Sequence, residues 1–288
     1  HDMTKVRVAA IQMRSCMDPA RNAEDFEALV REAAGQGAAY VQSPEMTGLL
    51  VRDKTALMAQ IKDEAEDPLV ACSSRLAREL GIHLHLGSTA IALPGGKVAN
   101  RAFLFDPSGE KRVSYDKIHM FDVDLDHGES WRESATYEPG KATRVAELPF
   151  GKLGFAVCYD LRFPQLFRAQ ALAGAEILTV PAAFTRQTGE AHWHVLLRAR
   201  AIENGAFVVA AAQGGRHEDG RETYGHSMIV DPWGRILAEA DHDEPGVVVA
   251  EIDLAAVADA RRKVPNLKNA RDFEVQTVAP TGGAGDGA

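Results

Sequence analysis

The 288-residue chain is poor in cysteine. Its three cysteines, at positions 16, 72 and 158, form neither the paired spacing of a zinc site nor a disulfide framework. No apolar run approaches the roughly 20 residues of a membrane-spanning helix, and no signal-peptide pattern precedes the first strand-like segment. Acidic residues outnumber basic ones, 41 to 32, and the net charge of -9 disfavours sequence-independent binding to nucleic acid. We therefore expect a cytoplasmic protein without membrane or nucleic-acid partners.

Strand-like and helix-like segments alternate along the chain. Apolar segments predict strands, and longer periodic segments predict helices. The strands are expected near 5–11, 39–43, 82–87, 153–158, 176–180, 206–212 and 247–252, and the helices near 21–36, 68–80, 165–172, 190–204 and 254–262. Two further segments, 98–114 and 227–239, read as hairpins around Pro-containing turns. This order predicts an α/β fold with mixed sheets covered by helices.

Domain boundaries follow from composition. No Gly/Ser/Pro-rich linker interrupts residues 4–275, so we expect a single domain there. His1 and Asp2 precede Met3, and residues 1–3 are interpreted as a remnant of expression plus the natural start. The Gly-rich end, 276–288, is expected to be a disordered tail.

Cys158 stands between an apolar strand-like run and a polar turn that leads into a helix. This order places its thiol at the carboxyl end of a sheet, where open α/β folds carry their chemistry. Backbone N–H groups of the turn favour a thiolate or an oxyanion there. A small buried hydrophobe, the usual role of a free cysteine, fits the same position equally well.

Two charged residues also follow strand-like segments. Glu45 comes after the strand at 39–43, and Lys117 comes just past the first hairpin. A thiol is only a few per cent ionised at neutral pH and needs a base or a positive field beside it. A carboxylate can take its proton, and a lysine can stabilise the oxyanion that forms. Taken singly, a Glu or a Lys is far more often a surface charge.

Histidines give no convincing metal site. His83 and His85 share one face of a predicted strand, but no acidic or cysteine partner is evident for them in the sequence. His192 and His194 are two residues apart on a predicted helix and therefore point in different directions. We expect neither a metal nor another cofactor.

Three motifs carry a family resemblance that covers residues 5–275. They are Ser43-Pro44-Glu45, Tyr115-Asp116-Lys117-Ile118-His119 and the segment 154–163 around Cys158. With them the chain resembles the nitrilase superfamily of carbon–nitrogen hydrolases. The resemblance implies a four-layer αββα sandwich, with Glu45 as general base, Lys117 as oxyanion stabiliser and Cys158 as nucleophile. It also implies a second glutamate, which Glu133 in Arg132-Glu133-Ser134 matches; Glu129 lies nearby but does not match.

Further segments resemble the Nit subfamily of small-acid amidases. They are 183–189, 192–193, 196–203 and 224–234, while 211–217 resembles most the branch that hydrolyses deaminated glutathione. The sister branch, the omega-amidases, acts on α-ketoglutaramate and α-ketosuccinamate. Residues 46–50 depart from the bulkier, aromatic-containing loop of the subfamily, and the resemblance implies that this loop borders the substrate pocket.

Four residues are candidates for substrate binding. Arg162 lies four residues after Cys158, and its guanidinium suits a carboxylate, although a structural ion pair is the alternative. The backbone N–H of Tyr159 is a natural second oxyanion donor. Phe184 and Thr188 lie in the segment that resembles the Nit keto-acid pocket, where they would supply an apolar wall and a hydroxyl donor.

Together these observations predict a thiol amidase. It would cleave the C–N bond of a small carboxylate or keto-acid amide through a cysteine acyl-enzyme, releasing acid and ammonia. Deaminated glutathione is the favoured substrate. The alternatives are omega-amidase activity on α-ketoglutaramate, another amidase or nitrilase of the superfamily, and a non-enzymatic scaffold or thiol redox sensor. We expect a small-molecule amide as partner, and a homodimer or higher homo-oligomer.

Overall fold

The computed structural model describes residues 4–281. The predicted expression remnant at 1–3 and the part of the predicted tail at 282–288 lie outside the described residues. Two six-stranded mixed sheets form the centre. The first has the order β16 (Gly246–Asp253), β1 (Lys5–Gln12), β2 (Tyr40–Gln42), β3 (His83–Ala92), β4 (Val98–Phe105), β5 (Lys111–Asp116). The second has the order β15 (Ile236–Glu239), β14 (Met228–Val230), β11 (Phe207–Ala210), β10 (Ile177–Thr179), β9 (Gly151–Gly154), β8 (Val145–Leu148).

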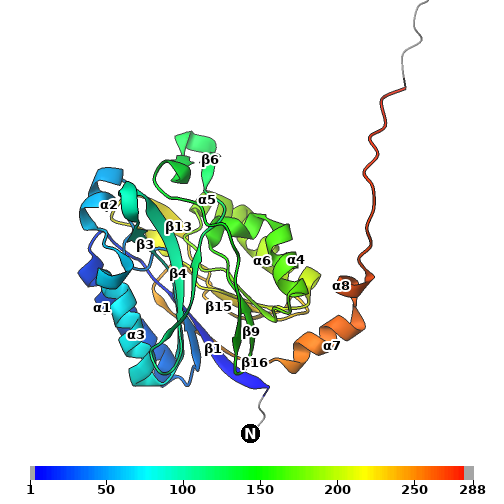
Figure 1. The fold of residues 1–288 in the computed structure, drawn as a ribbon, viewed down its shortest axis with the longest axis horizontal. Helices are drawn as coiled ribbons and strands as arrows, with labels where there is room; N and C mark the ends of the chain where they lie inside the picture. Colours follow the sequence, from blue (N-terminus) through cyan, green and yellow to red (C-terminus); the bar gives the residue numbers. More distant parts are fainter. Residues whose placement is uncertain (1–3, 282–288) are drawn as a thin grey trace, which may run out of the picture.

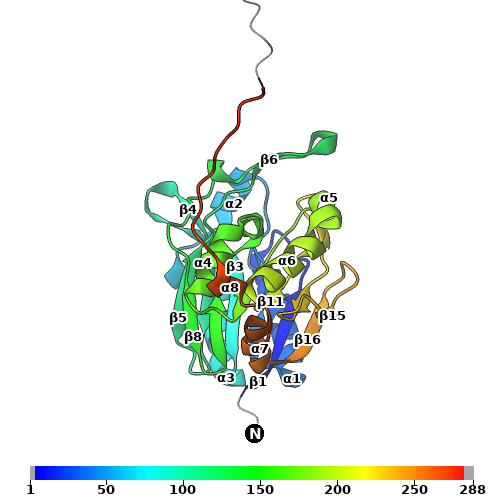
Figure 2. The same ribbon diagram turned by 90° about the vertical axis from the view of Figure 1, so that its right-hand side faces the viewer.

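The two sheets pack face to face because their strands bury side chains on both faces. In β1, Val8 and Ala10 belong to the core between the sheets, whereas Ala9 and Ile11 face the helices. Helices α1 (Pro19–Gly35) and α3 (Pro68–Leu80) cover the first sheet, and α4 (Pro164–Leu172) and α6 (His194–Asn204) cover the second. Figures 1 and 2 show these layers, and the predicted four-layer αββα sandwich is confirmed.

Shorter elements complete the chain. They are α2 (Lys54–Gln60), α5 (Arg186–Thr188), α7 (Ala255–Lys263), α8 (Asn266–Asn269) and two hairpins, β6 (Asp122–Asp124) with β7 (Ser130–Arg132) and β12 (Gly214–Arg216) with β13 (Glu222–Tyr224). The β6–β7 hairpin projects from one end of the sandwich (Figures 1 and 2). Beyond α8 the described chain, 270–281, has no regular structure and is exposed. Across residues 4–281, no helix combines the length and apolarity needed to cross a membrane.

The main departure from the sequence-based prediction lies before Cys158. The strand predicted to run up to this residue ends at Gly154, and Cys158 instead opens a short 3-10 helix, η5 (Cys158–Arg162). The carboxylate of Asp160 accepts a hydrogen bond from the N–H of Val157, and the N–H of Cys158 donates to the carbonyl of Pro181 at 2.9 Å. These bonds turn the backbone out of the sheet before the thiol is reached.

Candidate active site

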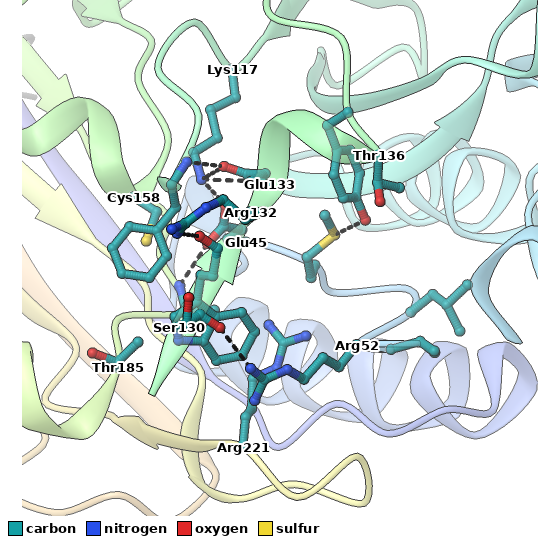
Figure 3. A pocket seen from close by; sticks show the side chains of 17 residues that line it. Glu45, Arg52, Lys117, Ser130, Arg132, Glu133, Thr136, Cys158, Thr185 and Arg221 are labelled. Atoms are coloured by element: carbon teal, nitrogen blue, oxygen red, sulfur yellow. Dashed lines mark hydrogen bonds and ion pairs between the residues drawn. The ribbon is translucent and has the colours of Figure 1, made fainter. Parts of the chain in front are cut away.

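A cavity of about 200 Å³ is lined in part by β7, the second strand of the β6–β7 hairpin. Glu45, Lys117, Glu133 and Cys158 line it together, although they come from four separate segments of the chain. Figure 3 shows their side chains converging, with Lys117 between the two carboxylates. The structure therefore brings together all four residues that the sequence singled out for catalysis.

A close backbone contact holds Glu45 in place. The residue follows β2, and Gly87 of β3 packs directly against the backbone of Ser43 and Pro44. A Cβ on Gly87 would lie 1.9 Å from the carbonyl oxygen of Ser43, so only glycine fits without a shift. The Glu45 side chain is buried, and its Oε1 accepts a hydrogen bond from the N–H of Ala183 at 3.1 Å.

Lys117 forms a buried ion network with both glutamates. Its Nζ lies 2.8 Å from Glu45 Oε2 and 2.9 Å from Glu133 Oε1. Asn100 of β4 donates to the same two carboxylates, at 2.9 Å and 3.3 Å. Burial alone would lower the pKa of Lys117, but the negative charges of Glu133 and Glu45 outweigh it and hold the pKa well above its ordinary value. The ammonium therefore stays charged.

Glu133 is the glutamate that meets the lysine. Besides its contact with Lys117, its Oε1 accepts a hydrogen bond from the N–H of Phe121 at 2.8 Å. Burial raises the pKa of Glu133, and the charge of Lys117 opposes this effect. Glu129, the glutamate that lies near Glu133 in the sequence, does not line the cavity.

Cys158 is buried and adopts a backbone φ of 47°, in the left-handed region that a residue other than glycine seldom occupies. Burial, and then the negative charge of Glu45, raise the pKa of its thiol well above the ordinary value, although Lys117 acts in the opposite sense. The sequence indicated backbone dipoles that favour a thiolate or an oxyanion at this position. Burial and the neighbouring carboxylate outweigh the effect of Lys117 on the thiol pKa.

Asp160 joins two of the three motifs. Its fully buried carboxylate accepts hydrogen bonds from the hydroxyl of Tyr115 at 2.5 Å and from the N–H of His119 at 3.0 Å. It also pairs with Nδ1 of His119 at 2.7 Å. The segment that carries Lys117 is thereby fixed to the turn that carries Cys158. Sequence inspection found both motifs but not this bond between them.

The predicted substrate-binding residues lie outside the lining of the cavity. Arg162 is half-buried beside the site: its Nη1 lies 3.2 Å from His192 Nδ1, and its guanidinium lies 5.1 Å from the ring centre of Phe184. Phe184 packs against Trp193. The hydroxyl of Thr188 is engaged by Thr185, at 2.7 Å.

The sequence missed several residues that line the cavity. They include Arg52, Trp131, Tyr137, Thr185 and Arg221. Most come from short polar segments without hydrophobic periodicity, so no pattern marked them. The loop after Glu45, whose sequence differs from that of the subfamily, borders the cavity through Met46 and Leu49.

One cluster of metal-ligand type exists among residues 4–281, and it is not in this cavity. Ligand atoms of His194, His226 and Glu239 lie within 4.8 Å of one another. Glu239 already pairs with both imidazoles, at 2.9 Å and 3.2 Å, which accounts for the cluster as a hydrogen-bonded group.

Comparison with known proteins shows the family of the chain. The sequence model of the carbon–nitrogen hydrolase family matches residues 7–262. The chain belongs to this family. Deaminated glutathione amidase of Yersinia enterocolitica is 40% identical over 93% of this chain and 94% of its own length. The human deaminated glutathione amidase is 41% identical, over 92% and 82% of the two chains. An omega-amidase of Danio rerio is 35% identical over 96% and 99%.

Solved structures of this hydrolase family are similar to the chain in fold. The NitFhit protein of C. elegans superposes with a TM-score of 0.87 at 34% identity, over 93% of this chain and 65% of that longer one. A mutant of an amidase from Nesterenkonia sp. AN1, which shows the result of Michael addition of acrylamide at the active-site cysteine, has a TM-score of 0.75 at 28% identity, over 91% of this chain and 98% of that one. The protein is thus a hydrolase that acts on amides, as predicted from its motifs.

Proposed function

We propose that this amidase uses Cys158 as nucleophile, Glu45 as general base and Lys117 as oxyanion donor, and that its substrate is deaminated glutathione. The observation that carries the chemistry is the convergence of a buried thiol, a buried carboxylate and a buried ammonium in one cavity. The names of two relatives, both deaminated glutathione amidases, support the substrate.

In the first half-reaction the thiol proton of Cys158 passes to Glu45 while the sulfur attacks the carbonyl carbon. Proton transfer during attack suits a thiol whose pKa is raised, because little thiolate is present at rest. Two carboxylates occupy two of the three N–H directions of Lys117, which leaves one for the oxyanion. The N–H of Tyr159 is the second donor. Glu45 then returns the proton to the nitrogen, and the amine leaves.

The second half-reaction hydrolyses the thioester. Glu45 takes a proton from water, the hydroxide attacks the acyl carbon, and the C–S bond breaks with the proton returning to sulfur. Glu133 keeps Lys117 charged and in position through both steps. Two carboxylates and one ammonium in a buried site need no metal for this cycle.

Arg162 is proposed as the anchor for a carboxylate on the acyl part. It has no carboxylate partner among the described residues, and it lies in the same short 3-10 helix as Cys158. Burial lowers the pKa of Arg162, and the interaction with Cys158 opposes this effect. Deaminated glutathione and α-ketoglutaramate share this acyl part. They differ in the amine, since cleavage of deaminated glutathione at that linkage releases cysteinylglycine and only a primary amide releases ammonia.

The oligomeric state is a further proposal. Three exposed apolar residues, Leu172 at 65%, Val195 at 67% and Ile202 at 52%, lie on the adjoining helices α4 and α6. Such a face supports a homo-oligomer assembled through these helices. A cytoplasmic location is likewise proposed, supported by the three unpaired cysteines.

The substrate proposal is tested by measuring kcat/KM in parallel for deaminated glutathione, α-ketoglutaramate and a simple aliphatic nitrile. We expect the highest value for deaminated glutathione, with equal amounts of acid and cysteinylglycine formed. A preference for α-ketoglutaramate would favour the omega-amidase alternative, which the 35% identity to the omega-amidase of Danio rerio supports. A preference for the nitrile would reject both.

A further inference from the structure

Three arginines line the cavity. They are Arg52, Arg132 and Arg221, and they line it together with Trp131 and Ser130. Figure 3 shows Arg52 and Arg221 on the side of the cavity away from Lys117 and Cys158, whereas Arg132 lies beside Glu133. The chemistry at Cys158 does not need the two charges on the far side, so they call for a separate explanation.

Two of the three arginines are already neutralised. Arg132 contacts both oxygens of Asp124, at 2.8 Å and 2.9 Å, and Arg221 pairs with Asp219 at 2.9 Å. Arg52 differs, because it has no carboxylate partner among residues 4–281. Of the three arginines, it is the one whose charge no carboxylate of the described residues balances.

Arg52 is nevertheless held in place. Its Nη2 donates to the carbonyl oxygen of Ser130 at 2.7 Å, and its guanidinium lies 4.0 Å from the ring centre of Trp131. The guanidinium of Arg221 lies 4.9 Å from the ring centre of the same indole. A fixed guanidinium with N–H groups to spare suits two-point binding of a carboxylate.

The position of this arginine indicates which part of a substrate it meets. The scissile carbonyl must lie at Cys158, where Arg162 is the proposed anchor for the acyl carboxylate. Arg162 is outside the lining of the cavity, whereas Arg52 is on its far wall. An amide held at both points therefore extends its amine part across the cavity to Arg52.

We propose that Arg52, stacked on Trp131, binds a carboxylate carried by the departing amine. The preferred substrates are then amides of an amino acid or short peptide, and primary amides are poor ones. This inference rests on the proposed function, since it assumes that the acyl transfer takes place at Cys158. It adds a specificity determinant in a loop that the sequence motifs do not cover.

The test compares two amides with one acyl part, deaminated glutathione and α-ketoglutaramate, in wild type, Arg52→Ala and Arg52→Lys. We expect Arg52→Ala to lower kcat/KM for deaminated glutathione about ten- to a hundredfold, the scale of one hydrogen-bonded charge contact. For α-ketoglutaramate the loss should stay below about threefold, because ammonia carries no carboxylate. For deaminated glutathione, the loss of kcat/KM in Arg52→Lys should lie between these values, since lysine keeps the positive charge but lacks the forked guanidinium that binds a carboxylate at two points.

Arg132→Ala is the matched control, because this arginine lines the same cavity but is paired with Asp124. It should change kcat/KM for the two amides by the same factor. A second readout is inhibition by cysteinylglycine, which Arg52→Ala should weaken by the same factor as the substrate.

The outcomes separate the two proposals. Equal losses on both amides in Arg52→Ala, or unchanged inhibition by cysteinylglycine, would overturn the inference and leave the amidase proposal standing. A wild-type enzyme that cleaves neither amide would overturn the proposed substrate, and the inference with it.

Discussion

The residue that decides the chemistry is a cysteine that keeps its proton at rest. Burial and the adjacent carboxylate of Glu45 both raise the pKa of Cys158. A protonated thiol resists alkylation and oxidation, so reactivity depends on a base that acts only when a substrate carbonyl is in place. This argues against the redox-sensor alternative.

Removing the nucleophile tests this directly. Cys158→Ala should abolish amide hydrolysis, because no other thiol lines the cavity in the described part of the chain. The melting temperature and circular dichroism spectrum should stay close to those of the wild type. Appreciable turnover by a purified Cys158→Ala protein would reject the mechanism.

The general base is tested by Glu45→Gln. This change keeps the size of the side chain and removes its basicity, so kcat should fall roughly 10²- to 10⁴-fold. Asn100→Ala is an informative comparison, because it removes one donor to Glu45 and leaves the base itself. A loss below tenfold in Glu45→Gln would show that another group takes the proton.

The pKa of Cys158 can be followed by alkylation with iodoacetamide. Because the pKa is raised, the rate should keep increasing through pH 9 rather than level off near pH 8. Glu45→Gln removes a negative charge beside the thiol, which lowers the pKa, so its alkylation curve should shift to lower pH. A wild-type plateau at or below pH 8 contradicts this assignment.

At the scale of elements, short backbone contacts position the catalytic side chains. Gly87 lets β3 approach the segment before Glu45, and Asp160 fixes the segment of Lys117 to η5. Neither contact is visible in a hydrophobic pattern, since each joins residues more than 40 positions apart. The sequence predicted α3 with its observed bounds, and in the structure Asp67 and Gly81 cap that helix.

Gly87→Ala should damage the site through the backbone. Its Cβ meets the Ser43 carbonyl at 1.9 Å, and the resulting shift should lower the free energy of unfolding by about 1–3 kcal/mol. We expect kcat to fall as well, because Glu45 moves with Ser43 and Pro44. Gly35→Ala, at the end of α1, is the control: its Cβ meets nothing within 4 Å, and stability should change by less than about 1 kcal/mol. Equal behaviour of the two variants in chemical denaturation would refute this role of Gly87.

What escaped prediction at this scale is the β6–β7 hairpin. Its strands are three residues each, so a single apolar residue between two polar ones, Val123 in one strand and Trp131 in the other, is too short a pattern to identify a strand. Glu133 was found by its resemblance to a family motif, whereas Trp131, two residues earlier, had no such guide. The early end of β9 was missed for a related reason, because the apolar residues 155–157 continue the strand pattern while the side chain of Asp160 bends the backbone.

At the scale of the whole molecule, the layers were predictable because alternating strands and helices must bury their faces against one another. The partner of the outer helices was not, since a sequence does not say whether an exposed apolar residue meets water or another chain. Leu172, Val195 and Ile202 pose this question on α4 and α6.

Assembly is tested by analytical ultracentrifugation. Val195→Glu should shift the protein towards monomer, because it places a charge in the centre of the proposed interface. Met58→Glu, an exposed apolar residue on α2, is the matched control and should leave the sedimentation coefficient unchanged. A wild-type protein that sediments as a monomer at micromolar concentration would reject the proposed oligomer.

The β6–β7 hairpin has a consequence for how this enzyme can diversify. Trp131, against which Arg52 stacks, lies in β7, and Glu133, which orients the lysine, comes directly after this strand. At the tip of the hairpin, the N–H of Asp126 donates to Oε1 of Gln187 in α5 at 3.2 Å. One short segment of the chain thus carries a residue that affects substrate selectivity and a residue that affects turnover. Libraries randomised at Trp131 should yield mostly slow enzymes, whereas those at Arg52, which lies outside the hairpin, can explore new amines at undiminished rate.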